Sequence, residues 1–232
     1  MSTVPESAFP DPALQQAALL VLKRQAAPAI EAARRSAAGI NAIGSEGDTL
    51  LLLAVENDDA GMVHALLTAG ANPDLPADNA PLAVAAGNAG LPVIEALLNA
   101  RAMPDAVSDS QPALWRAALL GREDVVRRLA SAGATLEKGN DQAETPLIAA
   151  VQGDQFRMAL LLLDLGASPF ATSDEGYTAG YWITRSVIPA GGVEGQARAR
   201  VIERIKAAGF PWPPPKPADV RAAQARGAWP PR

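Results

Sequence analysis

The sequence contains no cysteine, a single histidine and few aromatic residues. Without cysteine the chain can form no disulfide, no zinc–thiolate site and no thiol nucleophile. Aromatic residues make up only 4% of the chain, whereas hydrophobic residues, mostly alanine and leucine, make up 49%. Strands favour β-branched and aromatic residues, so this composition favours close-packed helices.

Long apolar runs and an excess of positive charge are also missing. Runs such as MALLLLDLGA are much shorter than the ~20 apolar residues that span a bilayer, and the start MSTVPESAFPDPALQQ shows no signal-peptide pattern. A net charge of -5 argues against a general nucleic-acid binder. We therefore expect no membrane span, no nucleic-acid partner and a cytoplasmic location, or a periplasmic one if a signal peptide has been removed.

The sequence does contain an internal repeat. A Gly-Ala pair, or a close variant of it, marks a recurring position at residues 39, 70, 101, 133, 166 and 209, which are 31, 31, 32, 33 and 43 residues apart. A second recurring pattern begins a helix in GDTLLLLAV (47–55), NAPLAVAA (79–86), QPALWRAA (111–118), AETPLIAAV (143–151) and EGYTAGYWI (175–183). In one of them Thr145 can cap the helix, Pro146 suits its first turn and Leu147 enters the core.

Both patterns recur about every 33 residues. This resembles the ankyrin repeat, in which each unit consists of a β-turn and two antiparallel helices. The resemblance covers residues 39–212. It implies an all-α ankyrin-repeat solenoid of about five helix-pair units, with an N-terminal helical cap and short β-turn hairpins. We expect a flexible N-terminus (1–10), one domain (11–212) and a proline-rich, extended tail (213–232) with a helical turn or two after Pro217. Within the domain we expect a cap at 11–43 and repeats at 44–75, 76–107, 108–140, 141–173 and 174–212, the last with a loop insertion at 187–197.

The helical pattern gives boundaries for each unit. The cap helices are expected at 11–23 and 27–37. The helix pairs follow at 50–57 and 60–69, 81–87 and 92–99, 113–120 and 123–131, 146–152 and 155–164, and 178–186 and 195–207.

The residues needed for catalysis are sparse. His64 is expected on an exposed helix surface, with no activated serine pattern to accompany it. Asp59, within the acidic stretch ENDD, is better explained as a helix cap than as a metal ligand, and AGGVEGQ lacks the Lys-Ser/Thr of a phosphate-binding loop. We therefore expect a non-enzymatic protein without cofactor or metal.

The ankyrin resemblance implies that a partner docks on the hairpin tips and on the exposed face of each first helix. Those positions hold ten carboxylates and one arginine, so a basic partner would be attracted; the alternative is that Asp and Asn occur there only as good turn residues. The candidate partner-binding residues are Glu46, Asp48, Glu56, Asp109, Gln111, Trp115, Leu119, Leu120, Asp141, Glu144, Gln152, Glu175 and Tyr177.

Within this set, Leu119 and Leu120 occupy positions that other units fill with polar residues or glycine, as the centre of an interface would require. Trp115 lies on another helix row, between Ala83 and Ile148 of the neighbouring units, where filling space in the core is the favoured explanation. Tyr177, Tyr181 and Trp182 form an aromatic group that either caps the core or extends the binding surface.

Two stretches, GDTLLLLAVENDDAGMVHALLTAGANPD and IKAAGFPWPPPKPADVRAA, resemble bacterial ankyrin proteins found with type VI secretion effectors. This resemblance implies an immunity protein that neutralises a cognate secreted toxin by occlusion. The alternatives are a generic adaptor, a secreted host-directed ankyrin protein and, remotely, an enzyme or enzyme-associated subunit. The partner is expected to be a protein with a basic or mixed basic and apolar surface, and the free chain is expected to be a monomer.

Overall fold

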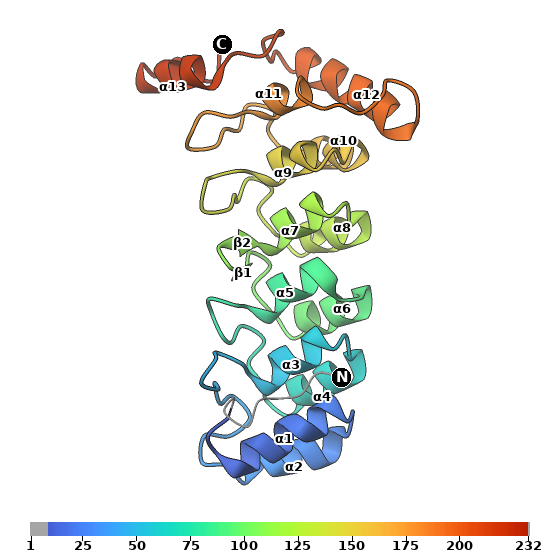
Figure 1. The fold of residues 1–232 in the computed structure, drawn as a ribbon, viewed down its shortest axis with the longest axis vertical. Coiled ribbons are helices and arrows are strands. Elements are labelled where there is room, and N and C mark those ends of the chain that lie inside the picture. Colours follow the sequence, from blue (N-terminus) through green and yellow to red (C-terminus); the bar gives the residue numbers. More distant parts are fainter. Residues whose placement is uncertain (1–8, 232) are drawn as a thin grey trace. The chain divides into compact units, whose positions relative to one another are not determined.

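A computed structural model describes residues 9–231 of the 232-residue chain. These residues form thirteen helices and one two-stranded hairpin, so the expected all-α class is confirmed. They divide into two compact units, residues 1–113 and 114–232, and Figure 1 shows hairpin loops projecting from the helix pairs of each unit. None of the described helices is long and apolar enough to cross a membrane.

Unit 1 consists of three helix pairs and the hairpin. Its first helices, α1, α3 and α5, pack against one another in series, and so do its second helices, α2, α4 and α6. The elements are α1 (Pro12–Leu22), α2 (Ala26–Arg34), α3 (Leu50–Glu56), α4 (Ala60–Thr68), α5 (Pro81–Asn88), α6 (Leu91–Asn99), β1 (Val107–Ser108) and β2 (Gln111–Pro112).

Unit 2 repeats this arrangement and adds a C-terminal helix. The first helix α9 packs against α11, and the second helix α10 packs against α8 and α12. The elements are α7 (Ala113–Leu119), α8 (Glu123–Ser131), α9 (Pro146–Gln152), α10 (Phe156–Leu165), α11 (Ala179–Ile183), α12 (Val193–Ala207) and α13 (Pro217–Ala225).

Polar links between neighbouring helix pairs recur within each unit. The Asp58 carboxylate accepts from the backbone N–H of Gly90 at 2.7 Å, and that of Asp74 accepts from Met103 at 2.8 Å. Glu137 accepts from the N–H of Ser168 at 2.7 Å in unit 2. Each bond satisfies a loop amide that the helices leave unpaired, so the repeats are joined by polar contacts as well as by their apolar faces.

The predicted caps are present. The hydroxyl of Thr145 accepts from the N–H of Ile148, and Asp59 accepts from the N–H of Met62 at 3.0 Å. His64 is exposed on α4, as expected.

Four expected boundaries are wrong. The second cap helix was expected at 27–37 but ends at Arg34. Residues 187–197 were expected to form a loop, but α12 begins at Val193, where Glu194 in the first turn suits the positive helix end. The first helix of the last pair was expected at 178–186 but ends at Ile183. The flexible N-terminus was expected to reach residue 10, but Phe9 is fully buried; the remainder of that segment, 1–8, lies outside the described residues.

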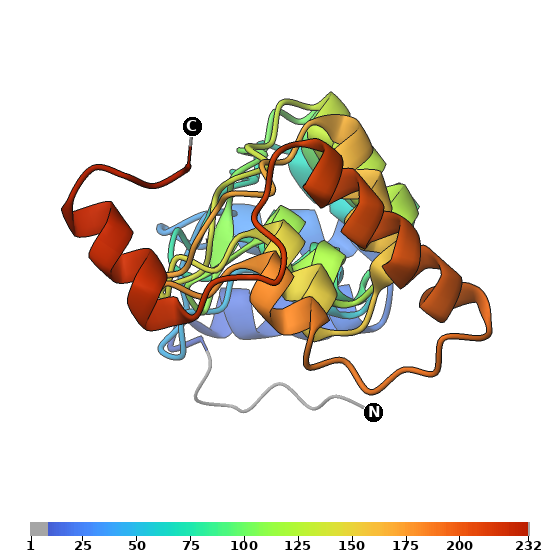
Figure 2. The same cartoon turned by 90° about the horizontal axis from the view of Figure 1, so that it is seen from above.

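The short helix expected after Pro217 is present in the C-terminal segment and is slightly longer than two turns. Residues Pro217–Ala225 form the nine-residue helix α13, and Val220 on that helix is buried. Figure 2 shows α13 apart from α12, on the side of unit 2 to which the hairpin loops project. The segment is therefore a folded part of unit 2.

Candidate functional site

The side chains just before and seven residues after a helix cap meet on one surface. Thr145 caps α9, and the Nε2 atom of Gln152, seven residues later, donates to Oε1 of Glu144, just before the cap, at 2.6 Å. Two helical turns take about seven residues, so Gln152 lies on the same side of α9 as the cap Thr145, two turns further along the helix. We call the positions of Glu144 and Gln152 the tip–helix pair of a repeat.

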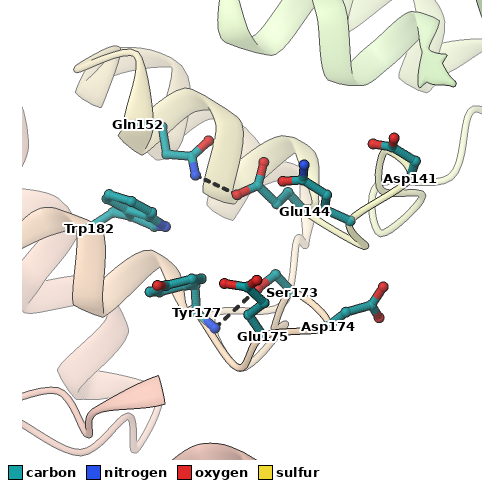
Figure 3. A pocket seen from close by; sticks show the side chains of 9 residues that line it. Asp141, Glu144, Gln152, Ser173, Asp174, Glu175, Tyr177 and Trp182 are labelled. Atoms are coloured by element: carbon teal, nitrogen blue, oxygen red, sulfur yellow. Dashed lines mark hydrogen bonds between the residues drawn. The ribbon is translucent and has the colours of Figure 1, made fainter. Parts of the chain in front are cut away.

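A pocket of about 520 Å³ lies in unit 2 beside the tip–helix pair Glu144 and Gln152. Figure 3 shows Glu144, Tyr177 and Trp182 converging on the space between two successive hairpins, with Asp141 and Asp174 nearer the rim. The lining comes from the hairpin before α9, from α9, from the hairpin before α11 and from α11. It comprises Asp141, Gln142, Glu144, Gln152, Ser173, Asp174, Glu175, Tyr177 and Trp182.

Neutral amides hold Glu144 on one wall of the pocket. Its Oε1 accepts from Gln152, and its Oε2 accepts from Nδ2 of Asn140 at 3.2 Å. The Oδ1 atom of Asn140 in turn accepts from the backbone N–H groups of Gln142 and Glu144, each at 3.0 Å. These bonds orient the Glu144 carboxylate and leave its negative charge without an opposite charge.

The opposite wall is a tight turn that carries aromatic rings. The backbone N–H of Tyr177 donates to Oγ of Ser173 at 3.1 Å, and the N–H of Ser173 donates to the carbonyl of Tyr177 at 2.9 Å. The Tyr177 ring lies 5.3 Å from the Trp182 ring and 5.1 Å from the Tyr181 ring, between centroids. The wall therefore presents a contiguous aromatic surface beside the carboxylates.

The charge in this pocket is of one sign. Four of its nine lining residues are carboxylates and none is a lysine or arginine. The guanidinium of Arg221 on α13 donates to the backbone carbonyl of Glu175, but Arg221 does not line the pocket. Among the described residues no group of histidines, aspartates and glutamates has the arrangement of a metal site. The pocket is therefore suited to bind a positively charged group next to an aromatic surface.

The structure brings five of the predicted site residues together in this pocket. Asp141, Glu144, Gln152, Glu175 and Tyr177 all line the pocket.

The three large apolar residues at the predicted site, on α7 or directly after it, differ in their exposure to solvent. Leu120 is 54% exposed, whereas Leu119 is half-buried against the end of α9. A Cβ at residue 153 would lie 2.9 Å from the carbonyl oxygen of Leu119 and 3.4 Å from its Cδ1. Trp115 is only 5% exposed. Its prediction as a partner-binding residue is therefore corrected: this row of α7 faces the interior, so Trp115 belongs to the core.

The predicted residues of unit 1 form a different kind of acidic cluster. Glu46, Asp48 and Glu56 belong to the hairpin before α3 and the end of that helix. Desolvation, together with the charge of Glu46, raises the pKa of Asp48. Desolvation also raises the pKa of Glu56, and the charge of Asp48 adds to the effect. This tip–helix pair is thus two repelling carboxylates.

Asp109 and Gln111 lie on the hairpin of unit 1. Asp109 is exposed at the turn, with φ +50°, and Gln111 pairs with Ser108 across the two strands. Neither residue lines the pocket of unit 2.

Comparison with known proteins agrees with this geometry. A family model for three copies of the ankyrin repeat matches residues 82–173, and a model for a single ankyrin repeat matches residues 46–78. The chain belongs to the ankyrin-repeat family. Ankyrin arrays use extended surfaces to bind other proteins, so the chain is an ankyrin-repeat protein-interaction module.

Solved ankyrin structures share the fold. The ankyrin repeat domain of Bcl-3, described as a unique member of the IkappaB protein family, is 22% identical, with a TM-score of 0.68 over 84% of this chain and 87% of that one. The human ASB11 ankyrin repeat domain is 24% identical, with a TM-score of 0.66 over 80% of this chain and 81% of that one. No curated protein matches the chain.

Sequence reasoning missed part of the ankyrin pocket. Gln142 and Asp174 are among the expected hairpin tips but were not kept in the candidate set, and Ser173, next to Asp174, could have been included as a neighbour in the same turn. Trp182 was considered only with the aromatic group of the last repeat. Its position four residues after the cap Thr178, on the same side as Tyr177, is the signal that could have placed it.

Proposed function

We propose that this ankyrin-repeat module binds a basic segment of another protein at the pocket of unit 2. The observation that carries the proposal is the pocket itself, where four carboxylates and two aromatic side chains line one cavity without a basic residue. An acidic surface speeds the approach of a basic partner. Tyrosine and tryptophan are the residue types that most often anchor such contacts.

The partner class follows from the resemblance to ankyrin proteins found with type VI secretion effectors. We propose a cognate secreted toxin that the module neutralises by covering a basic part of its surface. The competing class is an adaptor that binds several partners. A neutralising protein forms one tight complex and restores growth to cells that express the toxin, whereas an adaptor forms several weaker complexes and does not.

The binding surface can be tested before the partner is known. A photo-crosslinking residue placed at Gln142, on the pocket, is expected to trap a partner in cells of the source organism. The same residue placed at Ala199, exposed on α12, serves as the control. Equal crosslinking of the same protein at both positions would contradict the proposed surface.

A pair of charge variants then tests the electrostatics. Glu175→Gln removes an exposed carboxylate from the pocket lining, and Glu203→Gln removes one from α12. We expect weaker binding of the trapped partner only for Glu175→Gln, by about threefold to tenfold, measured by calorimetry. An equal effect of the two variants would indicate a general charge effect and would contradict the proposal.

A further inference from the structure

The pocket walls define the chemistry of a single anchoring group. On one side stands the Glu144 carboxylate, fixed by Asn140 and Gln152. On the other side are the rings of Tyr177 and Trp182, with centroids 5.3 Å apart and planes inclined at 38°. We propose that the pocket is a socket for one lysine or arginine side chain of the partner. This inference rests on the proposed function and specifies the group that enters the site.

The dimensions suit such a group. The volume of about 520 Å³ lies within the ~300–1,000 Å³ that is usual for ligand pockets. A long basic side chain has an apolar stem and a charged end. The stem would lie along the two rings while the charged end reaches the carboxylates of Glu144 and Glu175, so each part of the side chain meets matching chemistry.

The arrangement of Glu144 favours a charged ligand over a neutral one. Both of its oxygens accept from neutral amides, and its carboxylate is therefore oriented before a partner arrives. A carboxylate oxygen can accept more than one hydrogen bond, so both oxygens can still receive a donor. An arriving cation would supply the opposite charge that the described lining residues do not supply.

The same aromatic group already contacts a cation. The Cζ atom of Arg185 lies 4.7 Å from the centre of the Tyr181 ring. Tyr181 contacts both Tyr177 and Trp182, with ring centroids 5.1 and 5.5 Å apart. A guanidinium on one face shows that this cluster accommodates positive charge over its rings, and Tyr177 and Trp182 offer the pocket side for a second cation.

In this proposal Trp182 contacts the bound side chain through its aromatic ring and not through its N–H group. Its Nε1 is buried and has no hydrogen-bond partner, so the N–H group does not explain a tryptophan at this position. Phenylalanine would keep an aromatic face, whereas leucine would remove it. This difference supplies a matched pair of variants.

The test uses the full chain and four short peptides that differ at one central residue between glycine and serine flanks. The central residue is arginine, lysine, citrulline or glutamine, so that citrulline matches arginine without the charge. Binding is followed by NMR chemical shifts of the pocket amides and the tryptophan side chains. We expect the arginine and lysine peptides to bind at least about tenfold more tightly than citrulline and glutamine.

The variants assign the effect to the socket. Glu144→Gln and Tyr177→Leu are expected to weaken binding of the charged peptides by about fivefold to tenfold. Trp182→Phe is expected to retain binding within about threefold and Trp182→Leu to lose it. Asp48→Asn removes a carboxylate from unit 1 and is expected to leave binding unchanged. Circular dichroism and urea unfolding identify any variant that fails to fold.

The outcomes separate this inference from the proposed function. Equal binding of the arginine and citrulline peptides would overturn the socket. So would a crosslinked partner whose affinity is insensitive to Glu144→Gln and Trp182→Leu, even though that partner would still support a protein-binding module. Selective binding of the charged peptides without any crosslinked partner at Gln142 would support the socket and contradict the proposed protein partner.

Discussion

Two hairpins of this chain have nearly the same sequence but different surroundings. Residues 46–49 of unit 1 read Glu-Gly-Asp-Thr, and residues 175–178 of unit 2 read Glu-Gly-Tyr-Thr. In both, the glycine has a positive φ, +86° and +80°, and the threonine hydroxyl caps the next helix. The local conformation is therefore shared, and what differs is the residue before the cap and the contacts behind the glycine.

Those differences decide whether the carboxylates form a pocket. In unit 1 the tip–helix pair is Asp48 and Glu56, two groups whose mutual repulsion helps to raise the pKa of Glu56. In unit 2 the corresponding tip residues are Glu144, which is bonded to Gln152, and Tyr177, which supplies a ring. Negative charge alone gives unit 1 an attractive field, whereas an oriented carboxylate opposite an aromatic wall gives unit 2 a shaped site.

The largest expected effect on stability comes from adding a side chain at the glycine of each hairpin, because different atoms surround the two positions. A Cβ at residue 176 would lie 2.5 Å from the carbonyl oxygen of Pro217 and 2.9 Å from Cγ of Arg221, while one at residue 47 would meet no atom within 4 Å. Gly176→Ala is expected to lower the free energy of unfolding by about 2–4 kcal/mol, from the strained φ and the clash together. Gly47→Ala bears only the strained φ, about 1 kcal/mol.

Urea unfolding of both variants measures this difference. Equal losses would show that the contact of α13 with the Gly176 turn contributes nothing to stability. The peptide affinity of Gly176→Ala is also expected to fall, because the turn carries Glu175 and Tyr177.

A smaller effect is expected where the C-terminal segment supports the pocket wall. The Trp229 Nε1–H donates to the carbonyl of Phe170 at 2.9 Å, and the Nε2 atom of Gln224 donates to the hydroxyl of Thr172 at 2.8 Å. The ring of Trp229 also stacks edge-on against Phe210. Trp229→Phe keeps a ring but loses the hydrogen bond, so we expect a loss of about 1 kcal/mol.

Hydrogen exchange shows where this loss acts. Amides 172–178 are expected to exchange faster in Trp229→Phe, whereas amides 44–49 of the matching hairpin in unit 1 are expected to keep their wild-type rates. Unchanged exchange at 172–178 would mean that the C-terminal segment does not stabilise the pocket wall.

The parts of the structure that sequence reasoning recovered depend on local rules. Caps such as Thr145 and Asp59 act within three residues, and the tip–helix register follows from the helical repeat. Position within the repeat therefore sufficed to select Glu144, Gln152 and Tyr177 before any contact was known. The ankyrin family itself followed from the spacing of its helix starts and exits.

The parts that sequence reasoning missed depend on contacts between distant residues. The helix after Pro217 was expected, but its contacts were not. Arg221, Gln224 and Trp229 form hydrogen bonds to residues that lie 46, 52 and 59 positions earlier in the sequence, and a proline-rich composition does not indicate such contacts. The row of Trp115 favours the core, and its burial agrees; only its inclusion among the partner-binding candidates was wrong. Leu119 and Leu120 are adjacent, yet only the approach of α9 decides which one is covered.

The smallest expected effects are changes in the free energy of unfolding when a glutamate is replaced by glutamine, and they have opposite signs in the two acidic sites. Glu144→Gln replaces a carboxylate that accepts from two amides, so we expect a loss of about 1 kcal/mol. Glu56→Gln removes a repelling charge, so we expect a gain of at most about 0.5 kcal/mol at neutral pH, since solvent screens the group.

The gain at Glu56 is expected to depend on pH in a definite direction. Its pKa in the folded chain is raised above the ordinary 4.5, so the folded state holds the proton more tightly than the unfolded state. The stability linked to this group is therefore fully present below the unfolded pKa and is lost as the pH rises through the folded pKa. Urea midpoints measured from about pH 4, below the ordinary pKa, to pH 7 should show the advantage of Glu56→Gln over wild type growing toward neutral pH. A constant difference across that range would mean that neither desolvation nor the charge of Asp48 raises the pKa of Glu56 in the folded chain, and the contrast between the two acidic sites would then reduce to the aromatic wall alone.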